Sequence, residues 1–158
     1  MEIECGDCGD FVELTDKHYG EILRLHGLLP VRCSAEHGGR ECLLMLESDR
    51  LRVLFMRSDQ VETCELGSLG AEFPVGGLDV YGDSGWYNVI TLLEFKGGKK
   101  LLTRRRITQF AQDKPGYFAW QAELLSKNAE MLFGLFEPGR EQTWKEEYLR
   151  FFKAQLKG

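Results

Sequence analysis

Residues 42–66, CLLMLESDRLRVLFMRSDQVETCEL, decide the fold of this 158-residue chain. The stretch contains three mainly apolar runs, at 42–47, 50–57 and 61–66. Ser48-Asp49 and the segment 58–60 separate these runs, and both consist of residues that favour tight turns. Apolar and charged side chains alternate at the start of the second run, which indicates a strand with one covered and one half-exposed face. The stretch therefore predicts a three-stranded antiparallel meander.

The sequence before the meander predicts two short strands and one helix. Residues 10–14, DFVEL, are typical of a short strand. We expect Thr15 or Asp16 to cap a helix that ends near His26, because side-chain oxygens accept hydrogen bonds from the free amides of a first helical turn. A strand at 29–33 is expected within the loop that leads to the meander.

The sequence after the meander opens with a long glycine-rich stretch. Residues 67–83 contain five glycines, which predicts a loop, with a short strand at 78–81. Loops of this length inside a compact domain often have a function. A helix over 85–96, capped by Asp83 or Ser84, is expected to follow.

The remaining sequence predicts mainly helices. Residues 99–111 fit both a helix and a strand, and we favour a helix. A long helix is expected at about 116–136 and a last one at 144–156, where Thr143 and Glu146 have the spacing of a capping box. We therefore expect one α+β domain, in which a small antiparallel meander has helices packed on one side.

Composition indicates a globular chain rather than a disordered one. The hydrophobic fraction is 43%, with ten Phe, five Tyr and three Trp. No apolar run is long enough to span a membrane, and the acidic N-terminus has no apolar core of a signal peptide. We therefore expect a cytoplasmic protein that does not contact membranes, and whose cysteines are reduced.

The cysteine spacing suggests a metal-binding alternative. Cys5 and Cys8 form a CxxC pair, and Cys33, His37 and Cys42 could complete a tetrahedral zinc site. This alternative would make the protein a zinc-stabilised adaptor or a nucleic-acid-associated module.

The competing interpretation assigns the cysteines no ligand. Cys42 and Cys64 lie in predicted strands, where cysteine is commonly a small buried hydrophobic residue. On this interpretation, which we favour, the protein needs no cofactor.

The charges are divided between the two parts of the chain. The β-rich part, 1–95, has 18 acidic and 7 basic residues, whereas the helical part, 96–158, has 7 acidic and 13 basic residues. Six of the basic residues fall within 96–106, KGGKKLLTRRR. We consider nucleic acid an improbable partner, because no aromatic residues are interleaved there and the sequence pI is about 5.3. Such asymmetry indicates a macromolecular partner more than it indicates a fold.

Two groups of acidic residues are candidate contacts for a basic protein. The first group occupies the N-terminal sixteen residues: Glu2, Glu4, Asp7, Asp10, Glu13 and Asp16. The second group combines carboxylates with aromatic residues, and we take it as the main predicted partner-binding set: Glu62, Glu65, Glu72, Phe73, Asp79, Tyr81, Asp83, Trp86 and Tyr87. Aromatic side chains beside carboxylates are common at interfaces with Arg- or Lys-rich partners.

No catalytic motif is recognisable. The sequence has no nucleophile elbow, HExxH, phosphate-binding loop or GxGxxG. Asp79 and Asp83 could form a carboxylate pair, but aspartate in glycine-rich turns usually serves the turn itself. We therefore expect that the protein is not an enzyme.

Residues 50–158 resemble small bacterial immunity proteins encoded beside polymorphic toxins. The resemblance lies in the strands RLRVLFMR and VETCEL, the helix GWYNVITLLEF, the long helix ending AEMLFGLFEPG and the amphipathic last helix. It implies a cytosolic protein that binds a toxin domain and blocks it in a stoichiometric complex. The CxxC start departs from this pattern. The aromatic residues also allow a homodimer as an alternative.

Overall fold

The structure is a computed structural model that describes residues 1–74 and 84–157, and it has an α+β fold. Within these residues one antiparallel sheet has its strands in sequence order: Leu29–Glu36 (β1), Glu41–Glu47 (β2), Arg52–Ser58 (β3), Val61–Gly67 (β4) and Trp86–Asn88 (β5). The helices are Gly9–Leu25 (α1), Val89–Gly97 (α2), Arg104–Ala111 (α3), Lys114–Gly134 (α4) and Glu141–Lys157 (α5). Two short 3-10 helices are Gly6–Cys8 (η1) and His37–Gly39 (η2). The predicted antiparallel meander and helical C-terminal half are confirmed.

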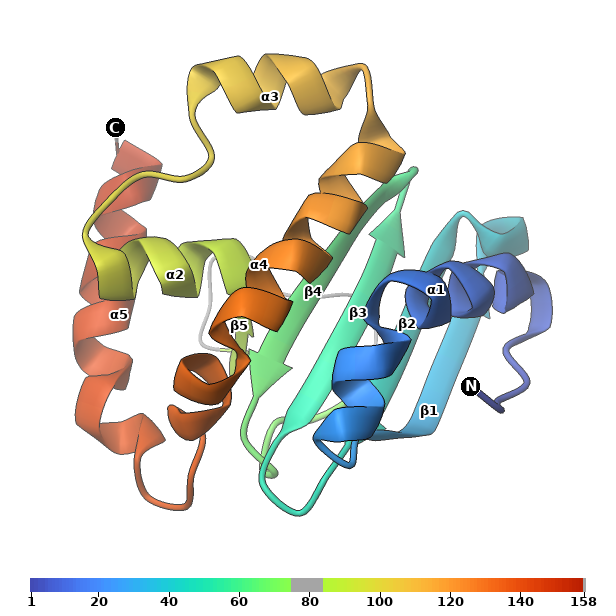
Figure 1. Ribbon diagram of the computed structural model, residues 1–158, viewed down its shortest axis with the longest axis horizontal. Coiled ribbons are helices and arrows are strands. Elements are labelled where there is room, and N and C mark those ends of the chain that lie inside the picture. Colours follow the sequence, from blue (N-terminus) through green and yellow to red (C-terminus); the bar gives the residue numbers. More distant parts are fainter. Residues whose placement is uncertain (75–83, 158) are drawn as a thin grey trace.

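Helices cover one face of the sheet. Figure 1 shows α1 and α4 lying across β2, β3 and β4, while α2 and α5 lie beside β5 and α3 stands apart from the sheet. Rings from α1, β3 and α4 pack against one another. The ring centroid of Tyr19 lies 4.6 Å from that of Phe55 and 4.9 Å from that of Phe118. The Tyr19 hydroxyl donates a hydrogen bond of 3.0 Å to the carbonyl oxygen of Phe118. These contacts fix α1 and α4 to the sheet and to each other.

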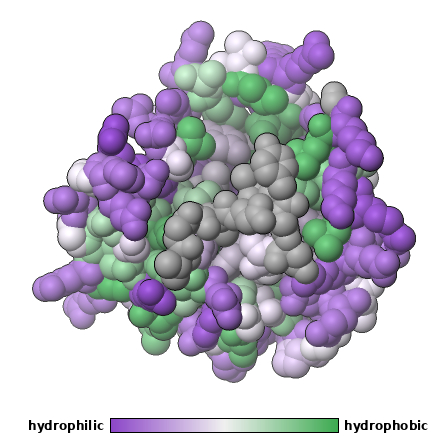
Figure 2. All heavy atoms as spheres, turned by 180° about the vertical axis from the view of Figure 1, so that it is seen from behind, coloured by the Kyte–Doolittle hydropathy of each residue, from purple (hydrophilic) through white to green (hydrophobic). Residues whose placement is uncertain are grey.

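The opposite face of the sheet is also partly covered. Met45, Leu54, Ala71 and Trp86 form a second buried cluster there, and Phe73 packs against it. Figure 2 shows the molecule from behind, where hydrophobic and hydrophilic residues are interspersed. Leu54 is fully buried, so the half-exposed face predicted for its strand is covered at that position.

The strand predicted at 10–14 is wrong, because these residues lie inside α1. Phe11, Thr15 and Tyr19 are spaced four apart and all are buried, which is the spacing of one helical face. Thr15 does not cap the helix. Its hydroxyl donates to the carbonyl of Phe11 within the helix at 2.8 Å, as a threonine in a helix interior commonly does.

The helix predicted at 85–96 begins later than expected. Trp86 and Tyr87 belong to β5, which pairs with the end of β4, and the helix starts at Val89. Asn88 is the cap, since its Oδ1 accepts from the backbone amide of Ile90 at 2.9 Å. Asp83 and the strand predicted at 78–81 lie outside the described residues.

The other helix predictions are largely confirmed, with one correction. The segment 99–111 is helical from Arg104 onward, and the long helix runs over Lys114–Gly134. The last helix begins at Glu141, so Thr143 lies within its first turn and the predicted capping box is wrong. Among the described residues, no helix is both long and apolar enough to cross a lipid bilayer.

Candidate functional site

Four of the five cysteines form disulfides that tie the N-terminal segment to the first hairpin. Cys5 is bonded to Cys33 with 5.7 Å between their Cα atoms, and Cys8 to Cys42 with 6.0 Å. Cys64 is free and buried. The expectation that the cysteines are reduced is therefore wrong for these four.

The sheet register explains this pairing. In the β1–β2 ladder Cys33 lies opposite Leu44, and Cys42 lies opposite Ala35, so the two cysteines sit two pairs apart on one face. The helix η1 packs against β1. This contact brings Cys5, at the start of η1, to Cys33, and Cys8, at its end, to Cys42. Sequence spacing could not reveal this, because it does not show which strand residues face η1.

The zinc site predicted from the cysteines is not assembled in this form. Zinc binds thiolates, and the sulfurs of Cys5, Cys8, Cys33 and Cys42 are engaged in disulfide bonds instead. His37 lies with two carboxylates rather than with the sulfurs. A zinc site of this composition would require both disulfides to be reduced.

One group of the described residues has a donor set suited to a divalent cation. Ligand atoms of Glu36, His37 and Glu41 all lie within 4.8 Å of one another, and His37 Nε2 is 3.5 Å from a Glu41 carboxylate oxygen. Glu36 and His37 are exposed. Such exposed groups are common on proteins without a metal ion, so we describe this one as part of the surrounding acidic surface.

The N-terminal carboxylates form an exposed surface beside these disulfides. We call it the acidic N-terminal surface, and its residues are Glu2, Glu4, Asp7, Asp10 and Glu13. Asp10 forms an ion pair of 2.9 Å with Arg57. Within the described residues no ion pair involves the other four. These four carboxylates are therefore exposed and, among the described residues, not held in a direct ion pair.

Asp16 holds the start of this surface in place. The N-terminal ammonium donates to its carboxylate at 3.1 Å, and Arg24 Nη1 donates to its other oxygen at 3.0 Å. Partial burial acts to raise the pKa of Asp16, but these two cations outweigh it and lower the pKa below its usual value. The Asp16 carboxylate is thus ionised and occupied, unlike the four carboxylates without a direct ion pair among the described residues.

The backbone also fixes the acidic N-terminal surface. Gly39 has φ of +88°, and a Cβ at this position would collide with the backbone carbonyl oxygen of Asp7. Only glycine adopts this conformation without strain and also permits so close an approach. The segment with Asp7 is therefore seated against η2 and is also held by the disulfides on either side.

Most of the described residues in the main predicted partner-binding set are buried. Glu62, Glu65, Trp86 and Tyr87 are each at most 8% exposed. The prediction that they form an acidic surface is therefore wrong for these four. The cause is that both faces of the sheet are covered here: the helices cover one face, and the second buried cluster, which includes Trp86, covers part of the other.

Each of these buried groups has a partner inside the chain. Glu62 accepts two hydrogen bonds from Arg57, at 3.1 and 2.9 Å. The indole of Trp86 donates to the carbonyl of Glu72 at 2.7 Å, and the hydroxyl of Tyr87 donates to Glu141 at 2.7 Å. These contacts join β3 to β4, and they join β5 both to Glu72 and to α5.

Glu65 lies on the opposite face of β4 from the helices. Its carboxylate accepts a hydrogen bond of 3.3 Å from Asn88. Burial raises the pKa of Glu65 to about 7, because the charged form loses its hydration. The buried Glu65 carboxyl group therefore changes its protonation near neutral pH, and it is not exposed for contact with a partner.

Five residues of the predicted set remain, and the structure describes two of them. Glu72 is exposed, and the ring of Phe73 lies 4.3 Å beneath the guanidinium of Arg32. Asp79, Tyr81 and Asp83 lie outside the described residues. Of the described residues in the set, Glu72 alone is exposed, and its neighbour Phe73 packs against the second buried cluster.

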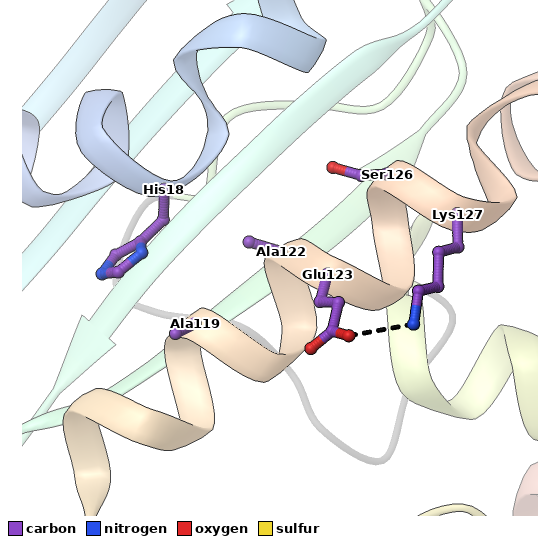
Figure 3. Close-up of a pocket in the computed structure, with 6 residues that line it drawn as sticks. All are labelled: His18, Ala119, Ala122, Glu123, Ser126 and Lys127. Atoms are coloured by element: carbon purple, nitrogen blue, oxygen red, sulfur yellow. Dashed lines mark hydrogen bonds and ion pairs between the residues drawn. The ribbon is translucent and has the colours of Figure 1, made fainter.

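A pocket of about 470 Å³ opens between α1 and α4. Figure 3 shows the residues that line it: His18, Ala119, Ala122, Glu123, Ser126 and Lys127. Lys127 forms an ion pair of 2.9 Å with Glu123 one turn before it, and both side chains are more than 60% exposed. Exposed pairs of this kind are common on helices, and we assign this pocket no catalytic role.

No protein-family model, curated protein or solved structure matches this chain. The resemblance to immunity proteins therefore stays a prediction. The function has to be argued from the acidic N-terminal surface and from the charges elsewhere on the molecule.

Proposed function

We propose that this protein binds and neutralises a toxin or effector domain in a stoichiometric inhibitory complex. The partner contacts the acidic N-terminal surface and is therefore a protein with a basic surface. Binding, rather than catalysis, is the proposed activity.

One observation carries this proposal: exposed carboxylates, Glu2, Glu4 and Asp7, lie on a segment that two disulfides hold in place. A segment already ordered before binding loses less conformational entropy when a partner arrives. Clustered charges of one sign also steer an oppositely charged partner and raise its association rate. An inhibitor that must capture a toxic enzyme quickly benefits from both properties.

The compartment is part of the proposal. The sequence predicts a cytoplasmic protein, whereas two disulfides favour a compartment in which thiols are oxidised. We propose that the disulfide-bonded form is the one that binds, because the two disulfides fix the segment that carries the carboxylates. The complex then forms in an oxidising compartment. It forms in the cytoplasm only if the two disulfides resist reduction there.

Co-expression tests the function directly. Each gene adjacent to the one for this chain is expressed with and without it, under conditions in which the two disulfides form, and growth is followed. We expect one neighbour to be toxic alone and harmless with this protein. Toxicity that this protein does not relieve, or no toxic neighbour at all, contradicts the proposal.

Charge reversal tests the surface. We expect the double variant Glu4→Lys and Asp7→Lys to associate with the partner about ten-fold more slowly at low salt. The matched control is Glu146→Lys and Glu147→Lys, which makes the same change of net charge on exposed positions of α5. Equal slowing by both pairs would show that net charge, and not this surface, steers the partner.

A further inference from the structure

The most basic segment of the chain is exposed and free of ion pairs. Five of its six cations are exposed, and Arg106 is half-buried: Lys96, Lys99, Lys100, Arg104 and Arg105 make up the exposed group. None of the ion pairs among the described residues includes any of the six. The acidic residues that the structure describes therefore do not neutralise this charge through direct ion pairs.

These cations lie on an ordered scaffold rather than on a loose tail. The Glu94 carboxylate accepts hydrogen bonds from the backbone amides of Leu101 and Leu102, at 2.7 and 3.2 Å. Thr103 caps α3, and Arg106 Nη1 donates to the carbonyl of Leu101 at 2.7 Å. The path of the chain from α2 into α3 is thus fixed by its own hydrogen bonds.

The helix α3 contributes nothing to the core. None of its residues is buried, and Ile107 is 51% exposed. Figure 1 shows α3 standing away from the sheet at the end of α4, and away from the N-terminus. A helix with this exposure is free to contact another molecule along most of its length.

Aromatic rings lie directly beside these cations. Phe110 of α3 stacks on Trp120 of α4 with 5.2 Å between ring centroids, and Tyr117 lies 5.3 Å from Phe110. The guanidinium of Arg106 lies over the Trp120 ring at 5.0 Å. All four side chains are half-buried, so part of each remains accessible. We call these residues the aromatic cluster.

We propose that α3, the segment that leads into it and the aromatic cluster form a binding surface for single-stranded nucleic acid. The cations contact the phosphates, and the accessible rings stack on unpaired bases. A cationic track next to stacking rings is the arrangement that binds single strands without strict sequence preference. Single-stranded nucleic acid matches the cations and the rings together, since it offers a phosphate and a planar base in every nucleotide.

The overall negative charge of the chain does not prevent such binding. Charges further apart than about 8–10 Å are largely screened at physiological salt, so the local surface decides the contact. The acidic N-terminal surface lies on η1 and α1, away from α3 in Figure 1. This inference concerns a second surface and does not depend on the proposed function.

The test uses the full, disulfide-bonded chain and labelled oligonucleotides. Fluorescence anisotropy at about 50 mM salt measures binding of oligo(dT) and oligo(U) of about 16 nucleotides, long enough for a small single-strand site. Tryptophan fluorescence provides a second readout, because Trp86 and Trp144 are only 8% and 5% exposed. Quenching on binding therefore reports mainly Trp120.

Four variants separate the two parts of the surface. We expect Arg104→Glu with Arg105→Glu to weaken binding at least about ten-fold, whereas Lys153→Glu with Lys157→Glu on α5 makes the same charge change and has little effect. We expect Trp120→Leu to weaken oligonucleotide binding about five-fold or more, as loss of one stacked base does, and to leave heparin binding unchanged. Trp120→Phe retains a ring and restores most of the affinity. It also answers the objection that the leucine variant is misfolded.

Several outcomes would overturn the inference. Absence of oligonucleotide binding at about 50 mM salt removes it outright. Equal weakening by the α5 control shows a nonspecific effect of net charge. Binding that does not depend on Trp120 and that polyglutamate competes fully assigns the surface to an acidic protein instead.

Discussion

The amide side chain of Gln121 completes the hydrogen bonding of a central strand. Strand β4 pairs with β5 over the segment 65–67, and among the described residues the preceding backbone groups of β4 have no strand partner on that side. Gln121 is fully buried on α4, and its Nε2 donates to the carbonyl of Glu62 at 2.8 Å. Its Oε1 accepts from the amide of Cys64 at 3.1 Å. One side chain thus substitutes for a missing piece of strand.

Replacing this amide should cost stability. We expect Gln121→Leu to lower the free energy of unfolding by about 2–3 kcal/mol, because it leaves one buried donor and one buried acceptor unsatisfied. Urea unfolding followed by circular dichroism measures the loss. Gln142→Leu, at an exposed position of α5, is the control and should change stability little. A Gln121 variant as stable as the original chain would show that water can reach these backbone groups.

Glu65 should make stability depend on pH near neutrality. Its pKa is about 7 in the folded chain and near the ordinary 4.5 of a glutamate side chain when the chain is unfolded. The folded state therefore binds the proton more tightly, so this contribution is complete below about pH 4.5 and is lost as pH rises through 7. We expect Glu65→Gln to remove this decrease and to stabilise the chain by about 3 kcal/mol above pH 8.

Thermal unfolding between pH 5 and pH 9 measures the effect. Glu72→Gln, an exposed carboxylate of the same region, is the control. Parallel profiles for the Glu65 variant and the original chain would mean that Glu65 is hydrated in the folded state.

Among the elements, the segment before α1 depends most on its covalent links. The disulfides join residues 28 and 34 positions apart and fasten η1 to β1 and β2. Cross-links that close loops of this size restrict the unfolded chain and typically contribute about 3–4 kcal/mol each. The few hydrogen bonds of so short a helix could not replace them.

Reduction should therefore lower the melting temperature. We expect a dithiol reductant to destabilise the original chain, and Cys8→Ser with Cys42→Ser to destabilise it by about 3–4 kcal/mol without reductant. The remaining response of that variant to reductant reports the Cys5–Cys33 bond. Differential scanning calorimetry with and without reductant measures both. An unchanged melting temperature would mean that packing alone holds η1 in place.

Local pattern was a good guide to the longer elements and a poor one to the shortest. The runs at 42–47, 50–57 and 61–66 alternate over enough residues to be recognised as strands. Strand β5 has three residues and forms only because β4 lies beside it. The segment 10–14 has the composition of a strand, but it lies within α1, where Phe11 shares the buried face with Thr15 four residues later. Non-local pairing and helix phase decided these cases.

At the scale of the whole molecule, opposite charges are separated in space as they are in sequence. The acidic N-terminal surface lies on η1 and α1, and the exposed cations lie between α2 and α3. A net charge of −5 therefore describes neither surface. Two partners of opposite charge can each meet a surface that suits them.

Ion exchange provides a measurement of this separation. We expect the folded chain at pH 7 and low salt to be retained on both an anion exchanger and a cation exchanger, because each resin meets one surface. Arg104→Glu with Arg105→Glu should abolish retention on the cation exchanger only. A chain that passes straight through the cation exchanger would behave as its net charge alone requires.

The sequence by itself determined the α+β class, the meander, the long helices and the uneven charge, because these follow from local periodicity and composition. Only the tertiary structure decided which charges remain at the surface. It buried Glu62 and Glu65, paired four cysteines and placed Trp120 beside Arg106. These outcomes depend on contacts between residues far apart in the chain, and no local pattern encodes which distant side chain a given residue will meet.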